Sequence, residues 1–331
     1  MRYWKRSRAA ILGLGAWCVL ASMAQAQPGT TPGEKPSART IPIIGFVEDV
    51  PATEQIAGPG KPVTLEPHVR VAFAKTADGW KPACVYSEGE TESPECLDLG
   101  LIRKVTWTVI HQSKRIGEVE TDGWYDARYY RTLGVLKRIS SSVPRVGKPE
   151  KEFASWLAPE AHRPLVALRD AKPMDPPGWS EAKPSIADMA TAHAIFLLAF
   201  KTLPNCKADS SGNQPIEARH LSVSHSSQSK AGERLLGVRL DPRLAVACEG
   251  PLGLEWSDLW FHAPADRPPA MLPVDIETDL APFRMVLLDM GDFDGDGKPE
   301  ALFWFSSHNV EGYLLVHDRF ERQARFMWKY Q

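Results

Sequence analysis

The chain has 331 residues, of which 43% are hydrophobic, and carries 39 basic and 41 acidic side chains. This slightly acidic balance disfavours nucleic acid and anionic lipid as partners, because both require a basic surface. The length allows one large domain or two ordinary ones, and 28 prolines favour strands, turns and irregular loops over long helices.

The first 26 residues have the pattern of a cleaved signal peptide. Four basic residues lie within the first eight positions, an apolar run covers 9–23, and small residues at 24–26 precede Gln27. A membrane anchor is the alternative, but a spanning helix needs about 20 apolar residues. Cys18 follows the bulky Trp17, which argues against lipid attachment. Cleavage leaves 35 basic against 41 acidic side chains, and the expected location is the bacterial periplasm or outside the cell.

A flexible linker and a β-rich region are predicted next. Residues 27–40 are rich in Pro, Gly, Thr and Ser, which is typical of a tether. The N-terminal β-rich region covers 41–170. Within it, 68–74 alternates apolar and polar residues with the period of two that indicates a strand. The segments 104–111 and 115–121 flank a short polar turn and predict a hairpin.

Proline is dense between residues 141 and 183, where it occurs seven times. A regular sheet does not tolerate that density, so we expect an extended segment with one short strand at 163–169. This segment is the predicted boundary between the N-terminal region and a C-terminal region at 171–331.

A helix is predicted near 185–202. Ser185 and Asp188 follow Pro184 and form an S-x-x-D capping box. Apolar spacing then predicts one buried face, composed of Ile186, Met189, Ala190, His193, Leu197 and Phe200. The apolar stretch is too short to cross a membrane, and no transmembrane segment is expected after signal cleavage.

The remaining chain returns to a strand pattern. The segments 218–227 and 234–242 flank a polar stretch and predict a hairpin, and four further strands are expected within 283–331. The predicted fold class is therefore mainly β, a β-rich α+β fold with one clear helix, arranged either like a propeller or as an irregular sandwich.

Four cysteines remain after signal cleavage, namely Cys84, Cys96, Cys206 and Cys248. An even number in an exported chain suggests two disulfides, and three pairings are possible. Cys84–Cys96 and Cys206–Cys248 are favoured because each pair closes a loop within one region. Zinc is the alternative, but no C-x-x-C spacing or nearby histidine supports it.

One acidic turn carries the most specific chemistry in the sequence. Its residues offer hard oxygen atoms to a cation, and they are Asp292, Asp294, Asp296, Lys298 (through its backbone carbonyl) and Glu300. Crowded carboxylates repel one another, and a divalent cation between them would convert that repulsion into attraction. Calcium accepts six to eight oxygens, whereas magnesium demands a stricter octahedron. The alternative is an Asp/Gly-rich surface turn without an ion.

The stretch "GDFDGDGKPEALFWF" resembles the FG-GAP or VCBS-type calcium loop, D-x-D-G-D-G-x-x-[DE], at every acidic and glycine position. It does not resemble an EF-hand, because Phe303 occupies the twelfth position where that loop needs Glu. The resemblance covers about 20 to 40 residues and implies Ca²⁺ held between two strands, mainly in a structural role. A full propeller repeats this loop in several blades, whereas this chain carries it once.

Hydrolase chemistry would need a Ser–His–acid group. A polar stretch contains His220, Ser222, Ser224 and His225. The strand period places His225 on the opposite face from the other three, and no G-x-S-x-G elbow occurs. The P-loop, the dinucleotide-binding glycine pattern and H-E-x-x-H are also missing. The stretch is therefore interpreted as the polar face of a hairpin.

The sequence thus favours a non-enzymatic, exported, calcium-stabilised protein with a structural or interaction role and a protein or glycan partner. The alternative is a hydrolase or a carbohydrate-binding protein with a cleft between the two halves. A converging cluster of titratable groups away from the acidic turn would favour the hydrolase. Exposure of Trp256, Trp260 or Tyr129 in a shallow groove would favour sugar or peptide binding.

Overall fold

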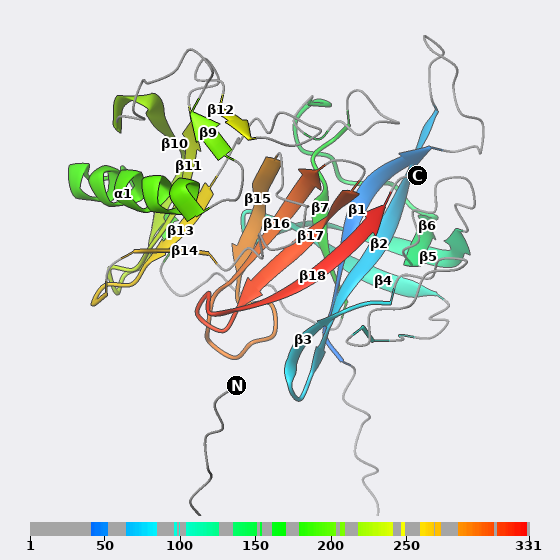
Figure 1. The fold of residues 1–331 in the computed structure, drawn as a ribbon. Helices are drawn as coiled ribbons and strands as arrows, with labels where there is room; N and C mark the ends of the chain where they lie inside the picture. Colours follow the sequence, from blue (N-terminus) through cyan, green and yellow to red (C-terminus); the bar gives the residue numbers. More distant parts are fainter. Residues whose placement is uncertain are drawn as a thin grey trace, which may run out of the picture. The chain divides into compact units, whose positions relative to one another are not determined.

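The fold was obtained as a computed structural model (Figure 1). It describes residues 41–51, 64–84, 96–97, 99, 104–125, 135–150, 153, 161–169, 179–202, 206–208, 218–240, 246–248, 259–267, 269–272, 284–307 and 310–329. The predicted signal peptide and linker, 1–26 and 27–40, lie outside these ranges. All described residues belong to one unit, Thr40–Gln331.

The described chain is mainly antiparallel β-structure with one α-helix, α1 (Ile186–Thr202). This confirms the predicted fold class. Four sheets are present among the described residues, with seven, five, four and two strands. The smallest pairs β9 (Cys206–Ala208) with β12 (Val246–Cys248).

The strands of the seven-stranded sheet all lie within the predicted N-terminal region, 41–170. Its order is β1 (Ile43–Pro51), β7 (Leu165–Arg169), β4 (Val105–His111), β5 (Lys114–Tyr125), β6 (Val135–Ile139), β2 (Leu65–Thr76) and β3 (Gly79–Pro82). Because β1 also pairs with β2, both edges of β1 are hydrogen-bonded. The predicted strand of the proline-rich segment is β7, which lies between β1 and β4.

Alternating side chains give this sheet two apolar faces. One face forms a core of its own, which includes Val47, Val69, Trp107 and Ala167. The other face includes Ile44, Phe46, Phe73, Val166 and Leu168, and it packs against the four-stranded sheet. The predicted hairpin at 104–121 is confirmed as β4–β5. Its two turn residues, Gln112 and Ser113, have positive φ angles of 51° and 59°, as tight hairpin turns require.

The four-stranded sheet runs in chain order, β15 (Arg284–Gly291), β16 (Glu300–Ser307), β17 (Val310–His317) and β18 (Arg322–Lys329) (Figure 1). One face contributes Leu302, Trp304, Tyr313, Phe326 and Trp328 to the core shared with the seven-stranded sheet. The opposite face contributes Ala301, Phe303, Phe305, Leu314 and Val316 to a second core. Every residue of β17 is buried, because each face of this sheet packs against one of the two cores.

The five-stranded sheet supplies the other side of that second core through Leu235 and Trp260. Its order is β14 (Ala270–Met271), β13 (Leu259–Ala263), β11 (Arg234–Leu240), β10 (Leu221–Gln228) and β8 (Ser180–Glu181), and a 3₁₀ turn, η2 (Ala218–His220), precedes β10. The predicted hairpin is confirmed as β10–β11. The four-stranded sheet therefore has an apolar partner on each face, and residues from 41–170 and from 171–331 share core clusters.

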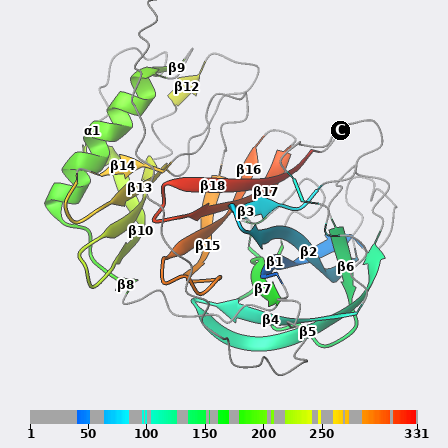
Figure 2. The same ribbon diagram turned by 90° about the horizontal axis from the view of Figure 1, so that it is seen from below.

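Helix α1 runs along the five-stranded sheet (Figure 2). Its capping box is confirmed: the Ser185 amide donates to Asp188 Oδ2 over 2.7 Å, and the Asp188 amide donates to Ser185 Oγ over 3.1 Å. The predicted buried face is wrong in part, because Ile186 is 91% exposed. The helix is rotated so that Ala192 meets the sheet, since a small side chain lets the helix backbone approach closely. Among the described residues, no helix has both the length and the hydropathy that a membrane crossing requires.

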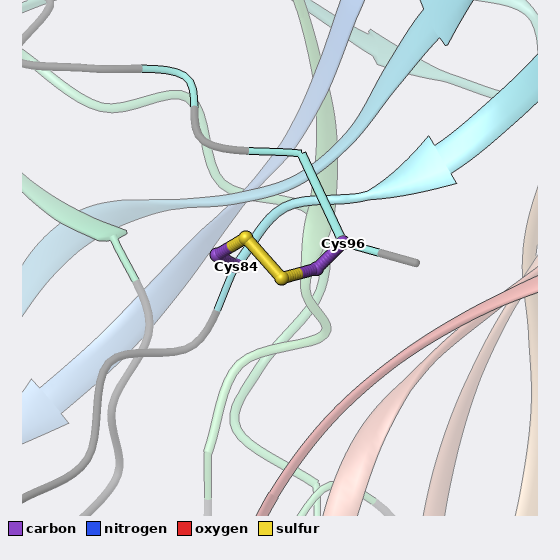
Figure 3. The surroundings of a disulfide bond; sticks show 2 residues. All are labelled: Cys84 and Cys96. Carbon is purple, nitrogen blue, oxygen red and sulfur yellow. A yellow bond between two sulfur atoms is a disulfide. The ribbon is translucent and has the colours of Figure 1, made fainter. Parts of the chain in front are cut away.

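The Cys84–Cys96 disulfide is confirmed (Figure 3). It fixes a short segment against the end of β3, where the Cys84 amide donates to the Leu97 carbonyl and the Leu97 amide donates to the Pro82 carbonyl. The second predicted pair lies on β9 and β12, whose register places Cys206 opposite Cys248. Their side chains lie outside the described set, so this pairing stays a prediction.

Candidate metal site

The acidic turn connects β15 to β16, and the two strands pair up to Gly291 and Glu300 at its base. Gly295 and Gly297 have positive φ angles of 76° and 83°, which residues other than glycine rarely adopt. No atom lies within 4 Å of the position that a Cβ would take at either glycine. The backbone path, and not crowding, therefore requires glycine at both positions.

Four of the predicted ligands converge in the folded turn. One carboxylate oxygen from each of Asp292, Asp294, Asp296 and Glu300 lies within 4.8 Å of the others. This set could hold a metal ion. Lys298 directs its Nζ to Asp318 Oδ1 at 2.7 Å and toward Asp296 Oδ2 at 3.6 Å, and the predicted role of its carbonyl oxygen stays a prediction.

Backbone amides of the turn hold the aspartates in place. Asp292 Oδ1 accepts hydrogen bonds from Gly295 at 2.7 Å and Asp296 at 3.1 Å, and Oδ2 accepts one from Gly297 at 2.9 Å. The Asp296 amide also donates to Asp294 Oδ1 at 3.0 Å. The Lys298 amide donates to Asp296 Oδ1 at 2.8 Å. These bonds orient the carboxylates before any cation arrives.

Glu300 and Asp292 are the most deeply buried members of the group, each with 1% of its surface exposed. Glu300 Oε2 accepts a hydrogen bond from the Phe293 amide at 2.7 Å, and no described group donates to its Oε1. Burial raises the pKa of Glu300 to about 8, and the three neighbouring aspartates add to the rise against the Phe293 hydrogen bond. A buried carboxylate facing three others needs a positive charge nearby to remain ionised.

A basic side chain from the seven-stranded sheet reaches the same turn. Lys75, on β2, forms an ion pair between its Nζ and Asp294 Oδ2, and the Asp294 side chain is only 3% exposed. Sequence reasoning missed Lys75, because it lies 219 positions before Asp294 and no local pattern connects the two.

The residues present fit a hard cation. The four converging atoms are all carboxylate oxygens, which suit Ca²⁺, Mg²⁺ or Mn²⁺, whereas softer metals prefer sulfur or imidazole nitrogen. The alternative from the sequence, a turn without an ion, would rely on Lys75 and Lys298 to balance the four carboxylates.

Among the described side chains of the polar stretch on β10, no serine, histidine and acid come together as a catalytic group. A β-bulge between Val223 and His225 interrupts the strand period, and His225 lies 5.5 Å from the Trp260 ring. His225 Nε2 lies 3.2 Å from Ser227 Oγ, but Ser227 is buried and offers no accessible nucleophile. Burial lowers the pKa of His225 and favours its neutral form.

Trp260 is not exposed in a groove and so does not support the alternative of sugar or peptide binding. Trp260 is buried, and its Nε1 donates a hydrogen bond to the Met285 carbonyl at 2.9 Å. The ring packs between the five-stranded and four-stranded sheets, where its apolar area contributes most. Trp256 and Tyr129 lie outside the described residues, so their exposure stays a prediction.

A second cluster of titratable groups lies away from the acidic turn. The buried Asp49 side chain accepts from Arg145 Nη2 on one oxygen and lies 2.7 Å from His162 Nδ1 through the other. A carboxylate on Nδ1 fixes the tautomer and directs Nε2 outward. Neither a serine nor a cysteine bonds to His162 in the part of the chain that the structure describes, so the cluster lacks a nucleophile there.

Comparison of the chain with protein families, curated proteins and solved structures finds no match. The resemblance of the acidic turn to the FG-GAP or VCBS-type loop therefore stays a prediction. The functional argument depends on the site itself.

Proposed function

We propose that the acidic turn binds Ca²⁺ and that the protein is an exported, calcium-stabilised β-rich protein with a structural or interaction role. The convergence of four carboxylate oxygens within 4.8 Å is the observation that supports this proposal most directly. Backbone amides already donate to all four side chains, so that little ordering would be needed on binding.

Calcium is the ion that suits this arrangement best. The ligands come from one short turn that includes two flexible glycines, and calcium tolerates variable numbers and directions of oxygen ligands. Magnesium requires a near-ideal octahedron and usually keeps several waters. We expect magnesium to bind more weakly than calcium.

The expected role of the ion is structural. The turn connects two strands of the four-stranded sheet, whose two faces belong to the two cores. A ligand that binds only the folded state adds stability by mass action, about 2.7 kcal/mol when its free concentration is a hundred times Kd. At about 2.1 cal/mol/K of unfolding entropy per residue, that gain corresponds to roughly 4 °C in Tm for a chain of this size.

The test is a thermal melt and a calorimetric titration of the full chain with Ca²⁺, with Mg²⁺ and with a chelator. Asp296→Asn is the matched variant, because its side chain is 37% exposed and its loss should spare the fold. The control is Asp266→Asn, an 85% exposed carboxylate outside the turn. We expect Ca²⁺ to raise Tm in the parent and in D266N, and much less in D296N. No bound metal and an unchanged Tm in the parent would refute the proposal.

The hydrolase alternative has one feature in its favour, the pair of the buried Asp49 with His162, whose side chain is 26% exposed. Its test is a panel of ester, amide and glycoside substrates assayed with the parent and with His162→Ala. Turnover that disappears in His162→Ala would support this alternative, and equal rates would exclude this histidine as a general base.

A further inference from the structure

We propose that Lys75 is a built-in competitor for the cation of the acidic turn and thereby sets the affinity of that site. The inference rests on the proposed calcium-binding function. It assigns two alternative counter-ions to Asp294: the Lys75 ammonium when no divalent cation is bound, and the divalent cation when one is.

The two carboxylate oxygens of Asp294 have different partners. Its Oδ1 accepts the Asp296 amide at 3.0 Å, whereas its Oδ2 receives no amide of the turn and is paired with Lys75 Nζ. Its side chain is nearly inaccessible, at 3% exposure. Lys75 therefore pairs with the Asp294 oxygen that receives no hydrogen bond from the turn itself.

The environment of Glu300 indicates that the four carboxylates need more positive charge than Lys75 provides. Its carboxylate is almost completely buried, and its Oε1 receives no hydrogen bond from any described group. No ion pair is formed by Glu300 in the described part of the chain, although three aspartates face it. A divalent cation at the meeting point of the four oxygens would compensate Glu300, which Lys75 does not contact.

The position of Lys75 allows its ammonium to leave while its backbone stays in place. The Lys75 amide donates to the Pro42 carbonyl at 2.9 Å, and Lys75 pairs with Trp80 in the β2–β3 hairpin. The side chain nevertheless keeps 27% of its surface exposed. A long, partly exposed lysine can turn its charged end into water without disturbing the strand.

The ammonium and a divalent cation cannot share Asp294 without strong repulsion, because like charges at contact distance in a buried site are poorly screened. Binding must therefore include the displacement of Lys75, and that displacement weakens binding. Removal of the charge in Lys75→Met should tighten Ca²⁺ binding at least tenfold, which corresponds to ~1.4 kcal/mol. Lys104 provides the control, because its side chain is 72% exposed and lies 3.6 Å from Glu120, outside the acidic turn. Lys104→Met should change the affinity less than threefold.

The experiment is a calorimetric Ca²⁺ titration of the parent, Lys75→Met and Lys104→Met. Tighter binding in Lys75→Met alone supports the inference, whereas equal or weaker binding in Lys75→Met overturns it. If the parent binds Ca²⁺ and Lys75→Met is no tighter, only this inference fails. If none of the three proteins binds Ca²⁺, the proposed function fails and the inference fails with it.

A measurement on the parent alone covers the case in which Lys75→Met does not fold. Amine acetylation of the full chain, read by peptide mass spectrometry, reports how accessible each lysine is. We expect Lys75 to react several-fold faster with saturating Ca²⁺ than with chelator, because its ammonium is released from Asp294. Lys104, with a 72% exposed side chain, should react equally in both. An unchanged or slower reaction of Lys75 with Ca²⁺ would overturn the inference.

Discussion

The Asp289 carboxylate is buried where the turn of the β4–β5 hairpin meets β15. Its Oδ1 accepts hydrogen bonds from the amides of Ser113 and Met290, both at 2.8 Å. Its Oδ2 is buried and has no hydrogen-bond partner among the described residues. An ionised carboxylate in this position has lost most of its hydration. The hydrogen bonds from the protein replace only part of the lost interaction with water.

Burial raises the pKa of Asp289 from 3.8 to about 6, against the amide hydrogen bonds and the charge of Arg163. Between pH 4 and pH 6 the folded protein therefore holds a proton that the unfolded chain has released. The contribution of Asp289 to stability is greatest below pH 4 and decreases as the pH rises through 6. Two pKa units correspond to about 3 kcal/mol.

Asp289→Asn removes this pH dependence. Asparagine keeps a carbonyl oxygen that can accept both amides and carries no charge at any pH. The free energy of unfolding of D289N, relative to that of the parent, should therefore be about 3 kcal/mol higher at pH 7 than at pH 4. Subtracting the value of the parent from that of D289N at each pH cancels the contributions of the other titrating groups, which both proteins share.

The assay is urea unfolding followed by tryptophan fluorescence at pH 4, 5, 6 and 7, with chelator present throughout. Asp266→Asn, at an 85% exposed position, is the control and should follow the parent at every pH. A constant difference between D289N and the parent from pH 4 to pH 7 would refute the reasoning. A loss of stability of D289N relative to the parent as the pH rises would refute it as well.

The disulfide and one glycine give two further predictions. Replacing Cys84 and Cys96 by serine opens a loop with a separation of 12 residues and should lower the free energy of unfolding by roughly 3 kcal/mol; urea unfolding checks this, and an unchanged midpoint would contradict it. Gly312→Ala would place a Cβ against the Phe326 carbonyl and 2.6 Å from the Phe305 ring. We expect a loss of about 2–3 kcal/mol, and a parent-like Tm for this variant would show that the strand spacing is wrong.

The elements that sequence reasoning predicted correctly have local signals. The β4–β5 hairpin follows from two alternating runs around a polar turn, and the start of α1 follows from the capping box at Ser185 and Asp188. The acidic turn follows from the spacing of its carboxylates, which four converging oxygens confirm. In each case the interacting residues lie within a few positions of one another, so that the local sequence pattern is sufficient to predict the contact.

The features that were missed depend on contacts between distant parts of the chain. Nothing in the segment 165–169 indicates that β7 pairs with both β1 and β4. The burial of Trp260 depends on the four-stranded sheet, and the orientation of α1 depends on how closely Ala192 approaches its sheet. Amphipathic spacing limits which faces can be buried, but the partner surface decides which one is.

The end of β15 shows why a cation in the acidic turn would act on more than one hairpin. This strand lies at the edge of the four-stranded sheet, and a bulge between Leu287 and Asp289 interrupts its pairing with β16. Arg163 donates to the carbonyls of Leu287 and Leu288, and the β4–β5 turn donates to Asp289.

These contacts cover backbone groups that an edge strand would otherwise leave open to other chains. They all come from the seven-stranded sheet, and Lys75 extends the same contact to the acidic turn. The turn therefore begins where the two sheets already meet. A cation that fixes the turn would stabilise the contact between the sheets as well as the strands on either side of it, while displacement of Lys75 would remove one of the bonds across that contact. The net stabilisation by the ion is the gain from fixing the turn minus the loss of the Lys75–Asp294 ion pair. Lys75 therefore lowers the affinity of the site for the ion.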